Sequence, residues 1–250
     1  ETSGDSVYGD GFPHYAHGPR LHEFLQEMHR EVFEGRSGLL TVGEMPGVSP
    51  EKAVLFTDPA RRELDMVFQF EHVGLDHGDS KFHPRPLQPG ELAASLTKWQ
   101  EALAPTGWNS LYLSNHDQPR ANNRFGDVVN YPVETATMLA TTIHLLRGTP
   151  YVYMGEEIGM TDPAYTSIAD YQDVEAINAF HELVGTGLSG DEAFAVVHSK
   201  ARDNSRTPMQ WDATPTAGFT SGTPWLRPTN QTQINVAAQE ESGRILPYYR

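Results

Sequence analysis

The sequence predicts an α/β fold built on a parallel sheet. Its apolar runs are short and continuous rather than alternating, which is typical of strands that are buried on both faces. Helical patterns lie among these runs, so that right-handed crossovers would close or extend the sheet. The expected strands are residues 39–42, 64–70, 111–113 and 151–154.

The helices are predicted from apolar residues that recur on one face. Residues 21–33 have this pattern, and residues 91–103 repeat it after a Pro89-Gly90 start. Residues 132–146 open with proline in the first turn and stop before a glycine, as helices commonly do. The order helix, strand, helix, strand is the signature of an α/β fold.

Four strands are half of an eight-stranded barrel, and the alternation weakens after Gly155. Further helices are expected at residues 173–183 and 191–199. Residues 204–230 are rich in Pro, Thr and Trp with little periodicity, which in a compact domain favours a shaped functional loop. The last residues, 245–250, show no closing element.

Composition argues against several classes of partner. A formal net charge of −15 over 250 residues disfavours nucleic acid, an anionic membrane surface and an acidic substrate. A neutral, hydroxyl-rich substrate is compatible with this charge, and so is a merely solubilising acidic surface. No window is apolar enough for a membrane span, and residues 1–5 have no signal-peptide character. Because cysteine is absent, a cytoplasmic location is expected.

Glu44 follows the first predicted strand, where the sheet gives way to a loop. A carboxyl group held partly out of water there has a raised pKa, which suits a general acid that protonates a leaving oxygen. The competing interpretation is a loop carboxylate that caps a helix beginning near Ser49. Glu71 and His72 end the second strand and are candidates for lining the same pocket.

Asp117 ends the third strand next to His116. This pair can bind vicinal hydroxyl groups and place negative charge beside an oxocarbenium-like transition state. Together with Glu44, it supplies the two carboxylates that cleavage of a glycosidic bond requires. Arg120 could orient Asp117 or reach a ligand, and an Asx-type turn is the structural alternative. No second histidine stands at ligand spacing, so no metal site is expected.

Arg206 stands beside Met and Trp residues in the irregular loop. A planar guanidinium with an apolar platform suits a sugar, and a surface Arg–Asp pair beside a packed Trp explains the pattern equally well. Glu156 and Glu157 follow the fourth strand. Because adjacent strand residues point to opposite faces, only one of them would face the pocket.

Six strings occur along the chain in the order TVGEMPG, FQFEHVGLD, LSNHDQPR, NRFGD, GTPYVYMGEEIGMT and ARDNSRTPMQWD. Together they resemble the oligo-1,6-glucosidase and α-glucosidase branch of glycoside hydrolase family 13, the α-amylase superfamily. The resemblance runs from about residue 39 to about residue 235. It implies a (β/α)8 TIM barrel that hydrolyses terminal α-linked glucose with retention of configuration.

By this resemblance, Glu44 matches the general acid/base and Asp117 the aspartate that stabilises the transition state. His116 would contact the sugar in the first subsite, and Arg206 would hold the glucose at the non-reducing end. Pro46 falls where neighbouring residues shape the leaving-group subsite. A small oligosaccharide is the implied substrate, and no cofactor follows from these residues. Linkage preference and oligomeric state stay open.

The chain departs from the family pattern at the nucleophile. The family carries this aspartate in a strand motif close to Gly-Phe-Arg-Met-Asp, and no such motif precedes Glu44. Asp65 lies after Glu44, so its position in the order rules it out. The resemblance therefore implies that residues 1–250 are the C-terminal portion of the barrel, strands 5 to 8 with long loops. The nucleophile strand and the C-terminal β-domain would be absent. We expect these residues alone to be inactive and poorly stable.

Three alternatives stay open. Sucrose isomerases and trehalose synthases share the scaffold and transfer the glucosyl group instead of releasing it. A non-catalytic relative would keep the barrel as a scaffold for a partner, although such a scaffold has no need of polar groups such as Glu44 and Asp117. A carbohydrate-binding module would need exposed aromatics, whereas the aromatics here fall mostly within predicted strands and helices.

Overall fold

The computed structural model describes residues 11–250, so the segment on which the signal-peptide expectation rests lies outside the described residues. The chain divides into two compact units, which we describe separately. The first unit runs up to His72 and includes Gly90–Ser110 and Arg147–Thr149. The second unit consists of Val73–Pro89, Leu111–Leu146 and Pro150–Arg250.

The first unit contains a parallel sheet. Strand β1 (Val42–Glu44) pairs in parallel with β2 (Met66–Phe68). Val67 then pairs in parallel with Asn109, whose carbonyl oxygen accepts a hydrogen bond from the Thr149 amide at 2.9 Å. The paired segments lie within or beside the four predicted strands, and their order across the sheet is the same as their order in the sequence. Crossover connections between neighbouring parallel strands produce this arrangement.

The strands are shorter than predicted or displaced. The first begins at Val42, and Leu39 and Leu40 are exposed. Strands β3 (Ser110–Leu111) and β4 (Thr149–Pro150) pair with each other. The prediction of a strand at residues 151–154 is wrong, because these residues follow β4 as an irregular segment. The carbonyl of Met154 there accepts a hydrogen bond from an arginine side chain instead of a neighbouring strand.

The helices of the first unit agree with the prediction. Helix α2 (Leu21–Met28) continues as a π-helix, η1 (His29–Phe33), and α4 (Pro89–Leu103) covers the second predicted region. One face of α4 is buried through Trp99 and Leu103, which pack with Phe56 and Val67 in a hydrophobic cluster. The other elements are α1 (Phe12–Tyr15), α3 (Pro50–Thr57), η2 (Pro59–Arg61) and η3 (His72–Gly74), which reaches into the second unit.

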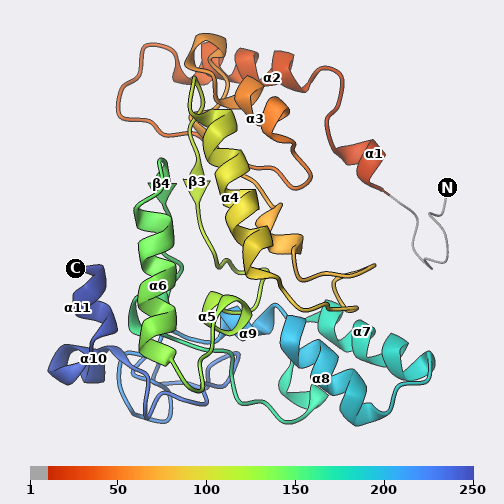
Figure 1. Ribbon diagram of the computed structural model, residues 1–250, viewed down its shortest axis with the longest axis vertical. Helices are drawn as coiled ribbons and strands as arrows, with labels where there is room; N and C mark the ends of the chain where they lie inside the picture. Colours follow the sequence, from red (N-terminus) through yellow and green to blue (C-terminus); the bar gives the residue numbers. More distant parts are fainter. Residues whose placement is uncertain (1–10) are drawn as a thin grey trace. The chain divides into compact units, whose positions relative to one another are not determined.

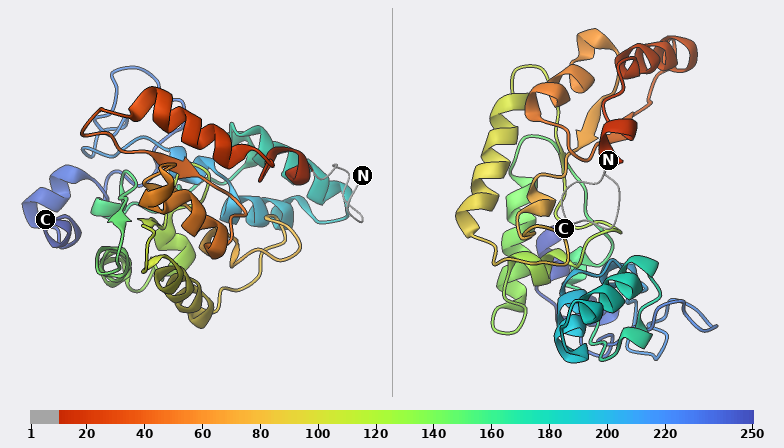
Figure 2. Two further views of the ribbon diagram at one scale, coloured as in Figure 1. Left: turned by 90° about the horizontal axis from the view of Figure 1, so that it is seen from above. Right: turned by 90° about the vertical axis from the view of Figure 1, so that its right-hand side faces the viewer.

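The second unit is mainly helical. Helices α7 (Val174–Gly185) and α8 (Gly190–Lys200) match the two predicted helices and lie side by side in Figures 1 and 2. Their facing residues, which include Leu183 and Val197, form a hydrophobic cluster with Tyr165 and Tyr171. The other elements are α5 (Ala121–Phe125), α6 (Pro132–His144), η4 (Glu156–Ile158), η5 (Ile168–Asp170), α9 (Asp203–Arg206), α10 (Val236–Ser242) and α11 (Ile245–Tyr249).

The C-terminal segment differs from the prediction. Residues 245–250 were expected to lack a closing element, but α11 forms there and packs against α6 and η4. The fully buried Ile245 anchors it. A helix of this length shows no periodicity that a sequence pattern could detect, because it spans little more than one turn.

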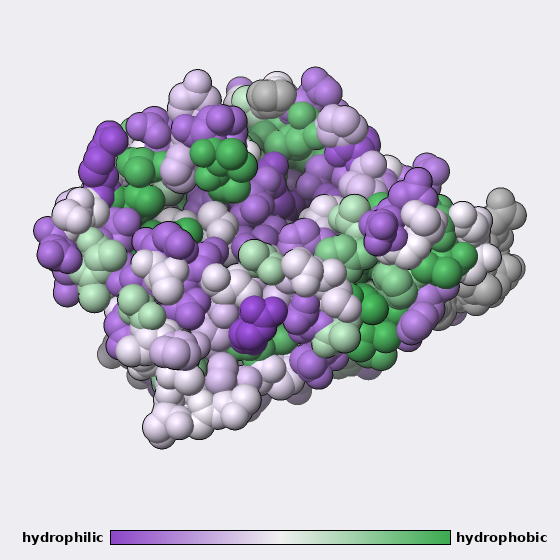
Figure 3. Space-filling model, turned by 90° about the horizontal axis from the view of Figure 1, so that it is seen from below, coloured by the Kyte–Doolittle hydropathy of each residue, from purple (hydrophilic) through white to green (hydrophobic). Residues whose placement is uncertain are grey.

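Some large apolar side chains remain exposed. Figure 3 shows hydrophobic residues in separate patches among hydrophilic ones on the face that it draws. Val129 and Leu145 are more than four-fifths exposed (84% and 81%). Apolar side chains exposed singly are common on protein surfaces and by themselves mark no interaction site. Within residues 11–250, no helix combines the length and the apolar character needed to cross a membrane.

The packing of α7 on α8 predicts a stability effect. Leu183→Ala should lower the free energy of unfolding by about 2–5 kcal/mol, because the side chain is buried between the helices and its removal leaves a cavity. Val174→Ala, on the same helix at a 65% exposed position, serves as the control and should change little. Urea unfolding measures both, and equal effects would contradict the assignment of this cluster as a core.

Candidate functional site

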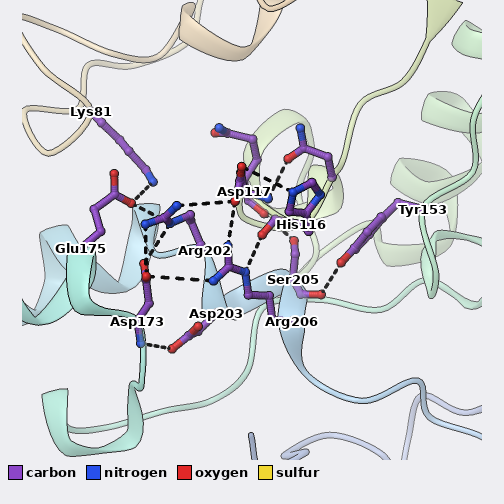
Figure 4. A network of polar contacts seen from close by, with 12 residues as sticks. Lys81, His116, Asp117, Tyr153, Asp173, Glu175, Arg202, Asp203, Ser205 and Arg206 are labelled. Atoms are coloured by element: carbon purple, nitrogen blue, oxygen red, sulfur yellow. Dashed lines mark hydrogen bonds and ion pairs between the residues drawn. The ribbon is translucent and has the colours of Figure 1, made fainter. Parts of the chain in front are cut away.

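The second unit brings together three residues that the sequence singled out. Arg206 Nη2 donates to Asp117 Oδ1 at 2.7 Å, and Arg206 Nε donates to the carbonyl oxygen of His116 at 2.7 Å (Figure 4). The side chains of Asp117 and Arg206 are 34% and 23% exposed, so the pair is half-buried but open to a ligand. The His116 ring is more exposed, with Nε2 at 3.6 Å from Asp117 Oδ2.

Local hydrogen bonds fix both sides of this pair. The Asn115 side chain accepts from the Asp117 amide at 2.9 Å, which is the Asx turn that the sequence suggested as a structural alternative. The Ser205 hydroxyl donates to the carbonyl of Gln118, and the Tyr153 hydroxyl donates to the carbonyl of Ser205 at 3.0 Å. Besides the ion pair, the Ser205–Gln118 bond thus joins the turn to helix α9, and Tyr153 attaches α9 to the segment after β4.

A second arginine extends the network (Figure 4). Arg202 binds Asp173 through Nε and Nη2, at 3.0 and 3.2 Å. Its Nη1 lies 3.6 Å from Asp117 Oδ1, and its Nε lies 3.1 Å from Glu175 Oε2. The Glu175 carboxylate also receives the Lys81 ammonium at 2.6 Å. Positive and negative groups thus alternate from Lys81 to Asp117.

Sequence analysis missed these four residues. Arg202 stands four positions before Arg206 in the string ARDNSR, so that spacing was a usable signal. The sequence pattern assigned Asp173 and Glu175 only to the start of a predicted helix. Lys81 lies in a loop, 94 positions from its partner, and no sequence pattern predicts that contact.

The loop that carries Lys81 is held by a buried ion cluster. Asp76 binds Arg124 at 2.6 Å and Lys200 at 2.5 Å, and the side chains of these two cations are only 2% and 4% exposed. Burial alone would raise the pKa of Asp76, but the hydrogen bonds and charges of the two cations lower it to about 2. This cluster ties the loop to α5 and to the end of α8.

Arg120, predicted to contact substrate, is 1% exposed. Its guanidinium donates to the carbonyls of Met154, Asn204 and Ser205 at 2.5, 3.3 and 3.3 Å. These contacts are those of a residue that joins loops, and they give no support to a role in binding. Next to it, Gly155 has φ of +94°, and an added Cβ would lie 2.9 Å from Arg120 Nη1.

Near Arg120, one carboxyl group is buried and a second is half-buried. Glu156 is 8% exposed, and its Oε2 accepts from the Tyr153 amide at 3.2 Å. Burial raises the pKa of Glu156 to about 7. Burial likewise raises the pKa of Asp162 to about 7, although its Oδ1 accepts from the Arg120 amide at 2.8 Å. Both groups can therefore be neutral near physiological pH.

Glu44, Pro46 and Glu71 belong to the first unit. Glu44 is the last residue of β1, but its side chain is exposed, so the expected desolvation is not observed. The alternative role of Glu44 as a helix cap is wrong, because the Ser49 hydroxyl caps α3 by accepting from the Lys52 amide at 3.4 Å. Pro46 is exposed in the turn after β1.

Glu71 is engaged within the first unit. Its Oε2 receives the Trp99 indole N–H at 3.2 Å and lies 2.5 Å from the Lys98 ammonium. Burial would raise the pKa of Glu71, but hydrogen bonds led by that from Lys98 keep it below its ordinary value. These contacts attach the turn after β2 to α4. Within residues 11–250, no group of three or more His, Cys, Asp or Glu side chains is placed to hold a metal ion.

Comparison with known proteins identifies relatives across the whole chain. Residues 2–249 match the family described as alpha amylase, catalytic domain. The chain is 51% identical over 254 residues to oligo-1,6-glucosidase of Parageobacillus thermoglucosidasius. A crystal structure of Bacillus licheniformis trehalose-6-phosphate hydrolase superposes with a TM-score of 0.91 at 43% identity over 98% of the chain. Isomaltulose synthase of Erwinia rhapontici gives 0.87 at 36% identity over 93%.

The chain spans less than half of these proteins. It covers 45% of the Parageobacillus relative and 44% and 42% of the two structures. The family fold expected from the sequence, the TIM barrel of α-amylase catalytic domains, is confirmed by these matches. They do not confirm that the chain is the C-terminal portion of the barrel.

The buried carboxyl groups predict a pH effect on stability. A group with a pKa of about 7 when folded and 4.5 when unfolded binds more protons in the folded state across that window. The free energy of unfolding should therefore decrease as pH rises through the window, by at most about 1.4 kcal/mol per pH unit for each such group. Glu156→Gln removes one group and should make the slope shallower. Urea unfolding at about pH 5 and about pH 8 tests this, and an unchanged slope would contradict it.

Proposed function

Because the chain belongs to the α-amylase catalytic-domain family, we propose that it is part of a retaining, exo-acting α-glucosidase that releases terminal glucose from short oligosaccharides. The main structural support for this proposal is the half-buried ion pair between Arg206 and Asp117, which ends the LSNHD string. A carboxylate there can face a cationic transition state, and a guanidinium can bind sugar hydroxyl groups.

The proposed roles follow the order of bond changes. A carboxylate nucleophile attacks the anomeric carbon while Glu44 gives its proton to the departing glycosidic oxygen. Glu44 then takes a proton from water, whose oxygen attacks the same carbon and releases the nucleophile. Asp117 stabilises both transition states, with His116 and Arg206 holding the glucose unit. The nucleophile would come from a part of the longer protein outside these residues, so we propose that residues 1–250 alone are inactive.

The charges of the site favour a neutral substrate. Each cation of the network faces a carboxylate, so none is left to neutralise a phosphate group. The pairs are Lys81 with Glu175, Arg202 with Asp173 and Arg206 with Asp117. Among the activities named for relatives, hydrolysis of an uncharged oligosaccharide therefore fits this site better than hydrolysis of trehalose 6-phosphate.

The catalytic assignment predicts large losses of rate. In the full-length protein, Glu44→Gln and Asp117→Asn should each lower kcat for p-nitrophenyl α-glucoside by at least about 1,000-fold. Asp65→Asn, at a residue excluded as nucleophile, should keep kcat within about threefold. Activity of Glu44→Gln near that of the unsubstituted protein, with an unchanged melting temperature, would refute the role of Glu44. Turnover by residues 1–250 alone would refute the proposal of an external nucleophile.

The charge balance predicts substrate preference. The full-length protein should hydrolyse isomaltose with a kcat/KM at least about tenfold above that for trehalose 6-phosphate, because phosphate would meet no unpaired cation. Chromatography of the products separates hydrolysis from transfer, since hydrolysis yields free glucose. A preference for the phosphorylated sugar would contradict the neutral-substrate proposal, and a rearranged disaccharide as the main product would contradict hydrolysis.

A further inference from the structure

Asp173 occupies an N-cap position without acting as a cap. It immediately precedes α7 with extended backbone angles, yet its side chain accepts no hydrogen bond from the first turn. Aspartate at this position ordinarily accepts from the amide two or three residues later. Here the carboxylate points instead to Arg202, at 3.0 and 3.2 Å, and to Arg206 Nη1, at 4.0 Å (Figure 4).

The position of Asp173 is itself fixed. Its side chain is only 6% exposed. Its amide donates to Asp203 Oδ2 at 2.9 Å, and the Gln172 amide donates to the same oxygen at 2.7 Å. Asp203 is fully buried and is the first residue of α9, the helix that also carries Arg206. Asp173 and Arg206 are therefore both positioned by α9, because Asp203 of that helix binds the backbone of Asp173 and Arg206 ends the same helix.

Both arginines approach the same oxygen of Asp117. Arg206 Nη2 lies at 2.7 Å and Arg202 Nη1 at 3.6 Å from Oδ1. Two cations that share one carboxylate oxygen repel each other, and a second anion beside both of them offsets this repulsion. Asp173 is that anion for both, because it binds Arg202 and lies 4.0 Å from Nη1 of Arg206, whereas Nη2 of Arg206 contacts Asp117.

We propose that Asp173 is a positioning residue that holds Arg202 and Arg206 in place against Asp117. It acts through the two arginines and not on the sugar. The functional consequence rests on the proposed glucosidase activity, whereas the structural consequence does not. When Asp173 loses its charge, the guanidinium groups should move, and the transition state should lose part of the fixed charge arrangement around Asp117.

The test is Asp173→Asn in the full-length protein. Asparagine has nearly the same shape and is as good a residue at the N-cap, so α7 should form normally. The exposed Glu182→Gln on the same helix is the matched control, because it removes one negative charge without touching the network. With p-nitrophenyl α-glucoside, Asp173→Asn should lower kcat about 10- to 100-fold and change KM much less, while the control stays within about twofold.

A double-substitution cycle and a crystal structure complete the test. In a background that carries both Arg202→Ala and Arg206→Ala, Asp173→Asn should lower kcat by less than about threefold, because both arginines through which it acts are gone. The crystal structure of Asp173→Asn should show at least one of the two guanidinium groups displaced by more than about 1 Å. Unmoved arginines, or a full additive effect of Asp173→Asn in the background that lacks both arginines, would overturn the inference. An unsubstituted protein that does not hydrolyse α-glucosides would overturn the proposed function, and the crystal structure would still decide the role of Asp173.

Discussion

The ion pair between Asp117 and Arg206 connects two segments that are 89 positions apart in the sequence. It brings the end of the LSNHD string against helix α9, and the surrounding contacts depend on that junction. Ser205 holds the carbonyl of Gln118, and Tyr153 holds that of Ser205. The role proposed for Asp117 requires such support, because small displacements of charged groups reduce stabilisation of a transition state.

The network also shows how an acidic chain can keep arginines at a site. The protein has a net charge of −15, and each cation of the site is paired with a carboxylate. Surface pairs of this kind contribute little to stability, because water screens them. These pairs matter because they fix the orientation of the charged groups. The side chain of Asp173 is nearly buried, so it can hold two guanidinium groups more firmly than an exposed partner would. In the proposed function, this balance of charges is what favours neutral sugars over phosphorylated ones.

The sequence predicted what local patterns control. The longer helices were predicted because the apolar residues of each recur with helical periodicity within its own sequence. They are α2, α4, α6, α7 and α8. Strand limits were less accurate, since an apolar run is compatible with a strand or with the irregular segment found at residues 151–154. The short α11 was missed because a single turn held by tertiary packing has no pattern of its own.

For the site, short motifs indicated His116, Asp117 and Arg206, and the structure brings these three together. Arg120 belongs to the same string but is buried among carbonyl groups, and burial of a charged residue depends on the whole fold. No sequence pattern indicated the role of Asp173, because its nearest cation, Arg202, is 29 positions away in the chain. Motifs therefore identified the charged pair, and only tertiary structure identified what supports it.

We propose that Asp117 and Arg206 both contact the bound glucose unit. A crystal structure of the full-length protein with bound glucose tests this directly. Hydroxyl groups of the sugar should lie within about 3 Å of both the Asp117 carboxylate and the Arg206 guanidinium. Glucose bound elsewhere, with this ion pair intact and untouched, would contradict it.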